Sequence, residues 1–172
     1  ENRPALNQGA HEVRVRYDDA GNYTQTDYFA ADGSAVRDEQ WGAASVRIGR
    51  DARGNATEVR LFDERGQPTI GTAGYSWYKV TYDARDRAVE HAYFDANGAP
   101  IALKKSGAAI TREVYDTRGQ LATVRHFDET GARVLNANGA FRFDTERDAR
   151  GNPITTRYFD VAERPVLTKS GY

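Results

Sequence analysis

Four aromatic side chains offer the best-defined chemistry in this sequence. They are Trp41, Tyr75, Trp77 and Tyr78, and they come from two short stretches of the chain. Large rings with a polar edge can form platforms for sugars or anchors for peptides. Local packing between neighbouring parts of the fold would use the same properties, so both roles stay open at this point.

Three arginines occupy one position of a recurring pattern and could bind an acidic partner. Arg60, Arg125 and Arg157 each lie three residues before the Asp of a Phe-Asp pair. A guanidinium group presents a planar fork of donors that matches a carboxylate. The alternative is pairing with carboxylates of neighbouring repeats, which contributes little free energy where the pair is exposed.

No set of residues indicates catalysis or a metal site. The three histidines, His11, His91 and His126, lack metal-ligand spacing. Each recurring Asp-x-x-Gly segment brings one carboxylate, whereas calcium needs several oxygens that converge on one ion. We therefore interpret these aspartates as turn caps. The sequence has no Gly-x-Ser-x-Gly motif and no phosphate-binding loop, so we expect no catalytic residue, no metal and no cofactor.

The composition limits the classes of partner. The 172 residues carry a net charge of −1, which argues against nucleic acid or an acidic membrane as the main partner. The absence of Cys excludes disulfides and thiol catalysis. No apolar stretch is long enough to span a bilayer. A chain without Cys fits an extracytoplasmic location (periplasm, cell surface or secreted), which we expect, and fits a cytosolic one equally well.

Repetition at a fixed period organises the whole chain. Phe followed by Asp-x-x-Gly, or a degenerate form of it, recurs at Phe29, Phe62, Phe94, Phe127 and Phe159, and the pattern advances in steps of 33, 32, 33 and 32 residues. A period in this range indicates a repeat architecture. Residues 3–9 are similar to 164–171. We expect one repeat domain over 1–172, cut from a longer array, with units at approximately 9–41, 42–73, 74–106, 107–138 and 139–171.

The pattern within a unit predicts two strands, two tight turns and a third short strand. Apolar and polar residues alternate before the first turn, as in 13–17 and 78–82, with the period of two that half-buried strands show. In the Asp-x-x-Gly turn, Asp accepts a backbone hydrogen bond and Gly takes positive φ. A second strand then ends at the Phe, and an extended piece such as 99–101 follows the second turn.

We therefore predict an all-β fold of five tandem three-stranded antiparallel units, each of 32–33 residues, in an open twisted array or β-solenoid. A closed, small five-bladed propeller is the alternative, although such a unit is short for a four-stranded blade. We expect the Phe column to form the buried spine. We also expect an altered last turn at Glu163, and positive φ at Asp86 and at six turn glycines: Gly54, Gly66, Gly98, Gly119, Gly131 and Gly151.

Two short motifs resemble known repeat families. The Tyr-Asp-x-x-Gly phrases that begin at Tyr17 and Tyr115 resemble the YD repeats of RHS and teneurin proteins. The unit length, the Gly-x-Ala…Asp-x-x-Gly order and the pair Trp41 and Gly42 resemble bacterial WG repeats. Both families are β-hairpin arrays that act as shells, spacers or binding surfaces. The resemblance implies this architecture and assigns a role to no single residue.

These observations favour a non-enzymatic structural or protein-interaction module of a larger bacterial cell-envelope or secreted protein. Its partner would be another protein, or neighbouring repeats and domains of the same chain. One alternative is a carbohydrate- or cell-wall-binding module that uses the aromatic residues. Another is a shell segment of an RHS-like toxin-delivery protein. We expect neither nucleic-acid binding nor insertion into a membrane.

Overall fold

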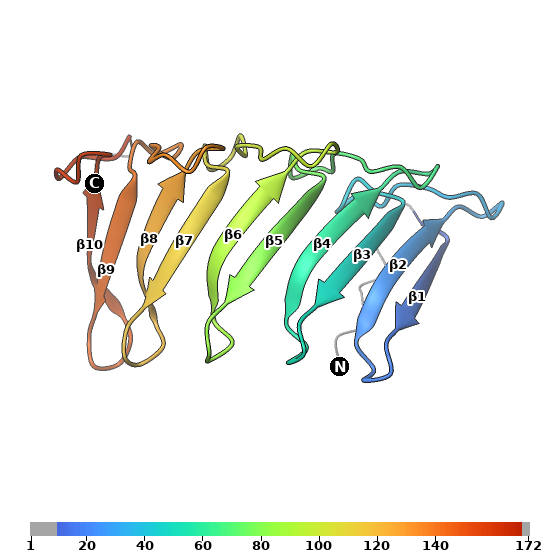
Figure 1. Ribbon diagram of the computed structural model, residues 1–172, viewed down its shortest axis with the longest axis horizontal. Coiled ribbons are helices and arrows are strands. Elements are labelled where there is room, and N and C mark those ends of the chain that lie inside the picture. Colours follow the sequence, from blue (N-terminus) through green and yellow to red (C-terminus); the bar gives the residue numbers. More distant parts are fainter. Residues whose placement is uncertain (1–9, 170–172) are drawn as a thin grey trace. The chain divides into compact units, whose positions relative to one another are not determined.

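The structure is a computed structural model that describes residues 10–169, and the regular secondary structure of these residues is entirely β. The chain forms two compact units, Glu1–Lys79 with Phe94–Ala99 and Val80–Tyr93 with Pro100–Tyr172. Successive strands form hairpins (Figure 1), with these bounds: β1 Glu12–Tyr17, β2 Tyr23–Phe29, β3 Ser45–Arg50, β4 Ala56–Phe62, β5 Trp77–Tyr82, β6 Ala88–Phe94, β7 Ile110–Tyr115, β8 Leu121–Phe127, β9 Arg142–Arg147 and β10 Pro153–Phe159. No helix long and apolar enough to cross a membrane occurs in this part of the chain.

Strand pairing follows the order of the sequence. The described strands are hydrogen-bonded in the order β1 to β10, and neighbouring strands are antiparallel. This order confirms the predicted all-β array of tandem hairpins. A propeller would instead divide the strands among separate blades, and the observed order shows no such division.

The third extended piece of each unit differs from the prediction. It forms no strand among residues 10–169, and in four repeats it makes a single bridge to the Phe that ends the hairpin, as Pro68 does to Phe62. Each repeat is therefore a two-stranded hairpin followed by a long connection without a strand of its own. Proline has no backbone N–H to donate to a longer ladder, which agrees with a single bridge at Pro68.

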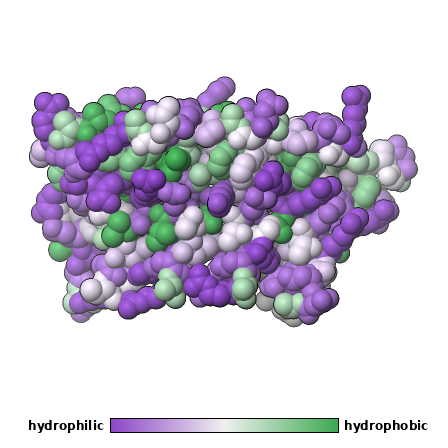
Figure 2. Space-filling view, viewed as in Figure 1, coloured by the Kyte–Doolittle hydropathy of each residue, from purple (hydrophilic) through white to green (hydrophobic). Residues whose placement is uncertain are grey.

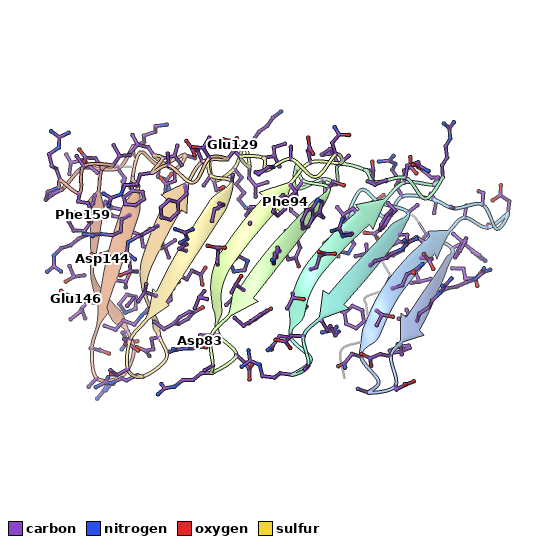
Figure 3. All side chains as sticks on the ribbon, viewed as in Figure 1. Asp83, Phe94, Glu129, Asp144, Glu146 and Phe159 are labelled. Carbon is purple, nitrogen blue, oxygen red and sulfur yellow. The ribbon has the colours of Figure 1, made fainter. Side chains whose placement is uncertain are left out.

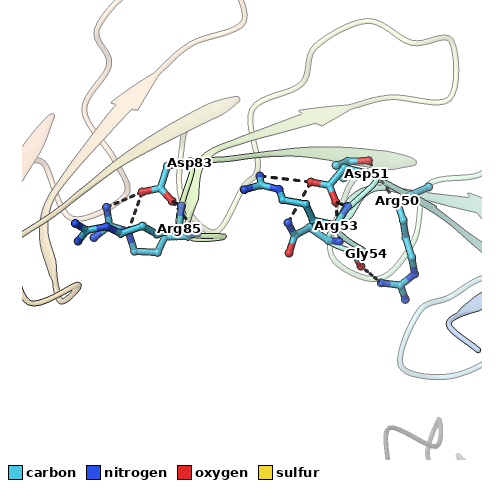
Figure 4. A network of polar contacts seen from close by, with 10 residues as sticks. Arg50, Asp51, Arg53, Gly54, Asp83 and Arg85 are labelled. Atoms are coloured by element: carbon cyan, nitrogen blue, oxygen red, sulfur yellow. Dashed lines mark hydrogen bonds and ion pairs between the residues drawn. The ribbon is translucent and has the colours of Figure 1, made fainter. Parts of the chain in front are cut away.

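The hairpin turns form because one Asp oxygen accepts two backbone hydrogen bonds. Asp51 Oδ1 accepts them from the N–H groups of Arg53 and Asn55, both at 2.9 Å (Figure 4). The same pair of hydrogen bonds stabilises the turns inside the hairpins and the turns that follow the Phe residues. The aspartates are Asp18, Asp51, Asp63, Asp83, Asp95, Asp116, Asp128, Asp148 and Asp160. The interpretation of these aspartates as turn caps is confirmed.

The last residue of each turn lies in the left-handed region. The six glycines predicted to do so have φ between +75° and +89°, and Asp86 has a φ of +60°. The prediction of an altered turn at Glu163 is wrong, because Glu163 has a φ of +63° and Asp160 still accepts the same two hydrogen bonds. The Glu163 carboxylate forms ion pairs with Arg142 and, at 3.2 Å, with Arg133.

The two faces of each hairpin differ in burial. One face carries Val46, Val59 and Leu61, which are between 1 % and 3 % exposed, and we call it the core face. The opposite side, which we call the Phe face, carries Phe62. Side chains alternate between the two faces along a strand. The prediction of a buried Phe spine is wrong for Phe29, Phe62, Phe94 and Phe159, which are only half-buried, because their rings share this face with charged residues. It is correct for Phe127, which is 8 % exposed.

Each Phe ring is covered by a side chain of the partner strand in its own hairpin. In four hairpins this is a guanidinium group, 4.0–4.5 Å from the ring centroid: Arg14 over Phe29, Arg47 over Phe62, Arg112 over Phe127 and Arg142 over Phe159. Trp77 takes this place over Phe94. Figure 3 labels Phe94 and Phe159 at the ends of β6 and β10. A cation over an exposed ring contributes roughly 0.5–1 kcal/mol.

Within each of the two compact units, the long connections between successive hairpins contact each other. The Thr72 N–H group donates to the Trp41 carbonyl at 3.0 Å, and two repeats further along the Ala137 N–H group donates to the Ser106 carbonyl at 2.9 Å. Gly71 permits the first contact, because a Cβ there would collide with the same Trp41 carbonyl oxygen. These hydrogen bonds join neighbouring connections inside each compact unit and fix the backbone at the bonded residues.

Candidate binding surfaces

An aromatic groove in the first unit brings together two of the predicted binding residues. Trp41 and Tyr78 line a cavity of about 330 Å³ on the core face, together with Tyr23 and Tyr28, which were not predicted. The remaining lining residues are Thr26, Gln40, Val46, Ile48, Ala56 and Val59. An apolar floor with several rings and a few polar groups is the usual composition of a small-ligand site.

One hydrogen bond and one ring contact support two of the aromatic residues of this groove, Trp41 and Tyr78. The Trp41 N–H group donates to Oδ1 of Asp38 at 2.9 Å, and Asp38 is only 1 % exposed. Tyr75 lies outside the groove and packs edge-on against Tyr78, with ring centroids 5.4 Å apart. The predicted residue Tyr75 is therefore a buried support for Tyr78 rather than a surface ring.

Tyr28 keeps its phenol protonated over the whole neutral range. Burial, and to a smaller extent the charge of Asp38, raises its pKa to about 12. The hydroxyl group can therefore both donate and accept a hydrogen bond. This is the polar capacity that a sugar hydroxyl or a peptide group would need in the groove.

A cavity of the second unit lies partly at the same repeat positions, and Tyr93 and His126 are the only rings among its described lining residues. It also has a volume of about 330 Å³, and Tyr93 corresponds to Tyr28. Ser106 stands in the repeat position of Trp41, and His126 stands in that of Leu61. The His126 ring is buried, which lowers its pKa, and its Nδ1 lies 3.0 Å from the Phe141 carbonyl oxygen. The two cavities have the same volume but different linings.

Trp77 lies on the opposite face from Tyr78, so the four predicted rings do not form one surface. Its ring stacks on Phe94 with a centroid separation of 3.8 Å, and the guanidinium group of Arg60 lies 4.2 Å from the Trp77 centroid. Because β4 and β6 flank β5, Arg60 and Phe94 cover the two sides of the ring. Neither side is open for a sugar to stack on.

The three predicted arginines have different partners. Arg60 forms an ion pair with Glu58, and Arg157 forms one with Glu146. Arg125 forms no hydrogen bond or ion pair with any residue in 10–169. Arg60 and Arg157 are therefore paired, but with carboxylates of their own hairpins and not of neighbouring repeats as expected, and Arg125 differs from both.

Arg125 belongs to a row of arginines that sequence reasoning missed. It lies directly opposite Arg112 on β7 and directly opposite Arg142 on β9. These two residues belong to the first strands of their hairpins, whereas the pattern that singled out Arg125 follows the second strands. The recurrence of Arg47 at Arg112, two repeats further along, was the available signal for Arg112.

The described residues contain no group of three or more His, Asp or Glu side chains arranged to hold a metal ion. His91 Nε2 lies 4.0 Å from Glu113, and His126 lies among residues of the second cavity. On the face drawn in Figure 2 most residues are hydrophilic, and the hydrophobic ones form small separate groups. The two surfaces with distinctive chemistry are thus the aromatic groove and the arginine row. Neither a scan against protein-family models nor a search of curated proteins finds a match to this chain.

Proposed function

We propose that this chain is a non-enzymatic repeat module that holds a protein-binding surface in a larger bacterial cell-envelope or secreted protein. One observation carries the proposal: the side chains that recur in every repeat are used to build the frame. The turn aspartates bond their own backbone, as Asp51 does, and the Phe rings are covered within their hairpins. The residues whose type varies from repeat to repeat are therefore the ones that would contact a partner.

One position illustrates this division between frame and surface. The fifth residue of the leading strand is Arg16, Gly49, Thr81, Val114 or Glu146 in successive repeats, and it is exposed on the Phe face each time. The backbone there is the same each time, while charge, polarity and size change. A regular frame with variable surface positions is the design by which repeat proteins create extended binding surfaces.

Selection from a phage-displayed library of random peptides tests this function. The folded chain and a urea-unfolded, immobilised copy are used as baits in parallel. We expect peptides that are enriched on the folded chain alone, because binding depends on the frame. The absence of such peptides would contradict the protein-binding role, and turnover of any substrate by the chain would contradict the non-enzymatic one.

A carbohydrate-binding role is the second candidate, and the aromatic groove favours it. Trp41, Tyr78 and Tyr28 combine flat rings with hydroxyl groups in one cavity of about 330 Å³. A glycan array probed with the wild-type chain and with Trp41→Ala tests it, and Trp77→Leu, on the opposite face, is the matched control. Glycan binding that is lost in Trp41→Ala and kept in Trp77→Leu would establish this role.

A further inference from the structure

We propose that the row Arg112, Arg125 and Arg142 is a binding site for an acidic peptide segment of a partner protein, with Arg125 as its central contact. The inference rests on the protein-binding function proposed above and names the chemistry of the partner. It is carried by the strand register and by the distribution of carboxylates on the Phe face of the second unit.

The register places three like charges side by side. Arg112 faces Arg125, and Arg125 faces Arg142, across the two ladders of β8. Directly opposite residues have Cβ atoms roughly 5 Å apart, and like charges in this relation destabilise a sheet. Such a row therefore destabilises the fold unless carboxylates pair with its members.

The two outer arginines are neutralised locally. Arg112 Nε donates to Glu90 at 2.7 Å, and its guanidinium group lies over the ring of Phe127. Arg142 is paired with Glu163 and, at 3.3 Å, with Asp144.

The nearby carboxylates on β9, labelled in Figure 3, are already engaged. The Thr123 hydroxyl donates to Asp144 at 3.0 Å, and Glu146 is paired with Arg157. The half-buried Arg125 guanidinium has no carboxylate partner among residues 10–169. An acid from outside can therefore pair with Arg125 without displacing an internal one.

The first unit provides an internal comparison. Two repeats earlier the row reads Arg47, Arg60 and Trp77 in the same register. There Arg60 pairs with Glu58 and lies over Trp77. In the second unit the position of Glu58 is Thr123 and that of Trp77 is Arg142. Both differences remove a local partner of the central arginine, and the second also adds a positive charge.

The surroundings fit a peptide better than a continuous polyanion. Val114, which is 45 % exposed, lies on the same face as Arg125, so an apolar side chain next to the acid would find a contact. Glu90, Asp144 and Glu146 lie along the same face and would repel a chain that is charged at every unit. A carboxylate can form two parallel hydrogen bonds with a guanidinium fork. The site therefore suits isolated carboxylates separated by apolar residues.

The same random-peptide library tests the proposal. It is selected in parallel on the wild-type chain, on Arg125→Gln and on Arg60→Gln, the matched arginine of the first unit. The most enriched peptide is then measured by fluorescence anisotropy beside a copy in which Glu and Asp are replaced by Gln and Asn. A heparin fragment serves as the polyanion probe, and circular dichroism confirms that each variant is folded.

We expect acidic peptides to be enriched on the wild-type chain and on Arg60→Gln. Arg125→Gln should weaken the best peptide by about tenfold or more, since hydrogen bonds to charged groups are the stronger kind. Enriched peptides without acidic residues, equal loss in both variants, or Arg125-dependent binding of heparin alone would overturn the proposal and leave the protein-binding function standing. A library that yields no peptide at all would overturn both.

Discussion

Trp77 lies almost parallel to Phe94, with ring centroids 3.8 Å apart and an angle of 9° between the planes. The guanidinium group of Arg60 lies on the other side of the indole. The three side chains come from three consecutive strands, β4, β5 and β6, and all three residues belong to the first unit. Its role is to hold the frame, although Trp77 has the residue type of a binding platform.

This arrangement predicts that Trp77→Ala destabilises the fold. The substitution removes a half-buried indole together with its stack on Phe94 and its contact with the Arg60 guanidinium group. It should therefore reduce the free energy of unfolding by about 2 kcal/mol. Urea unfolding followed by circular dichroism measures the loss. Trp41→Ala, on a connection of the same unit, should cost less. Equal losses would contradict the structural role of Trp77.

The sequence predicts the turns well because their cause is local. Asp51 and Gly54 are three residues apart, and neither depends on distant parts of the chain for its hydrogen bonds or φ. The stack of Arg60 on Trp77 depends on how β4 pairs with β5 across a long connection, and no local pattern gives that register. Strand alternation does place Trp77 and Tyr78 on opposite faces, so their separation could have been predicted.

The burial of the core face predicts that Leu61 contributes more to stability than its neighbour Phe62. Leu61 is 1 % exposed, whereas Phe62 is half-buried on the Phe face. Leu61→Ala should cost about 3 kcal/mol, in the range for a buried leucine, and Phe62→Ala should cost less. Urea unfolding of both variants decides this. A larger loss for Phe62→Ala would restore the Phe column as the main core.

The contact between two connections predicts that Gly71 does not tolerate a side chain. A Cβ there would fall on the Trp41 carbonyl oxygen and 2.5 Å from Cδ1 of Leu61. Gly71→Ala should therefore lower the free energy of unfolding more than Gly66→Ala does. An added Cβ at Gly66 meets no other atom, so that substitution costs only the strain of a positive φ, about 1 kcal/mol. Thermal unfolding of the two variants makes the comparison, and the reverse order would contradict the contact.

The hydrogen bonds of the turn aspartates predict loss of stability in acid. The side-chain hydrogen bond from Arg87, followed by the backbone N–H groups of Arg87 and Arg85, lowers the pKa of Asp83 to about 2. In the unfolded chain an Asp has a pKa of about 3.9. The folded state therefore binds fewer protons, and this contribution is present above about pH 4 and is lost as the pH falls towards 2.

Asp83→Asn tests this contribution, because the amide cannot titrate. The difference in the free energy of unfolding between the wild-type chain and Asp83→Asn should be largest above about pH 4 and should shrink as the pH falls. Urea unfolding at a series of pH values measures the difference. A difference that does not change with pH would show that the Asp83 carboxylate has the same pKa in both states.

Glu163 combines a strained backbone with an ion pair, and two substitutions separate these effects. Both Glu163→Gly and Glu163→Ala remove the ion pairs with Arg133 and Arg142. Only alanine keeps a Cβ at a φ of +63°, which costs roughly 1–2 kcal/mol. Glu163→Gly should therefore be the more stable variant by about 1 kcal/mol, since the entropy cost of glycine removes part of the gain. Thermal unfolding of the pair measures it, and equal stabilities would mean that Glu163 does not occupy the left-handed region.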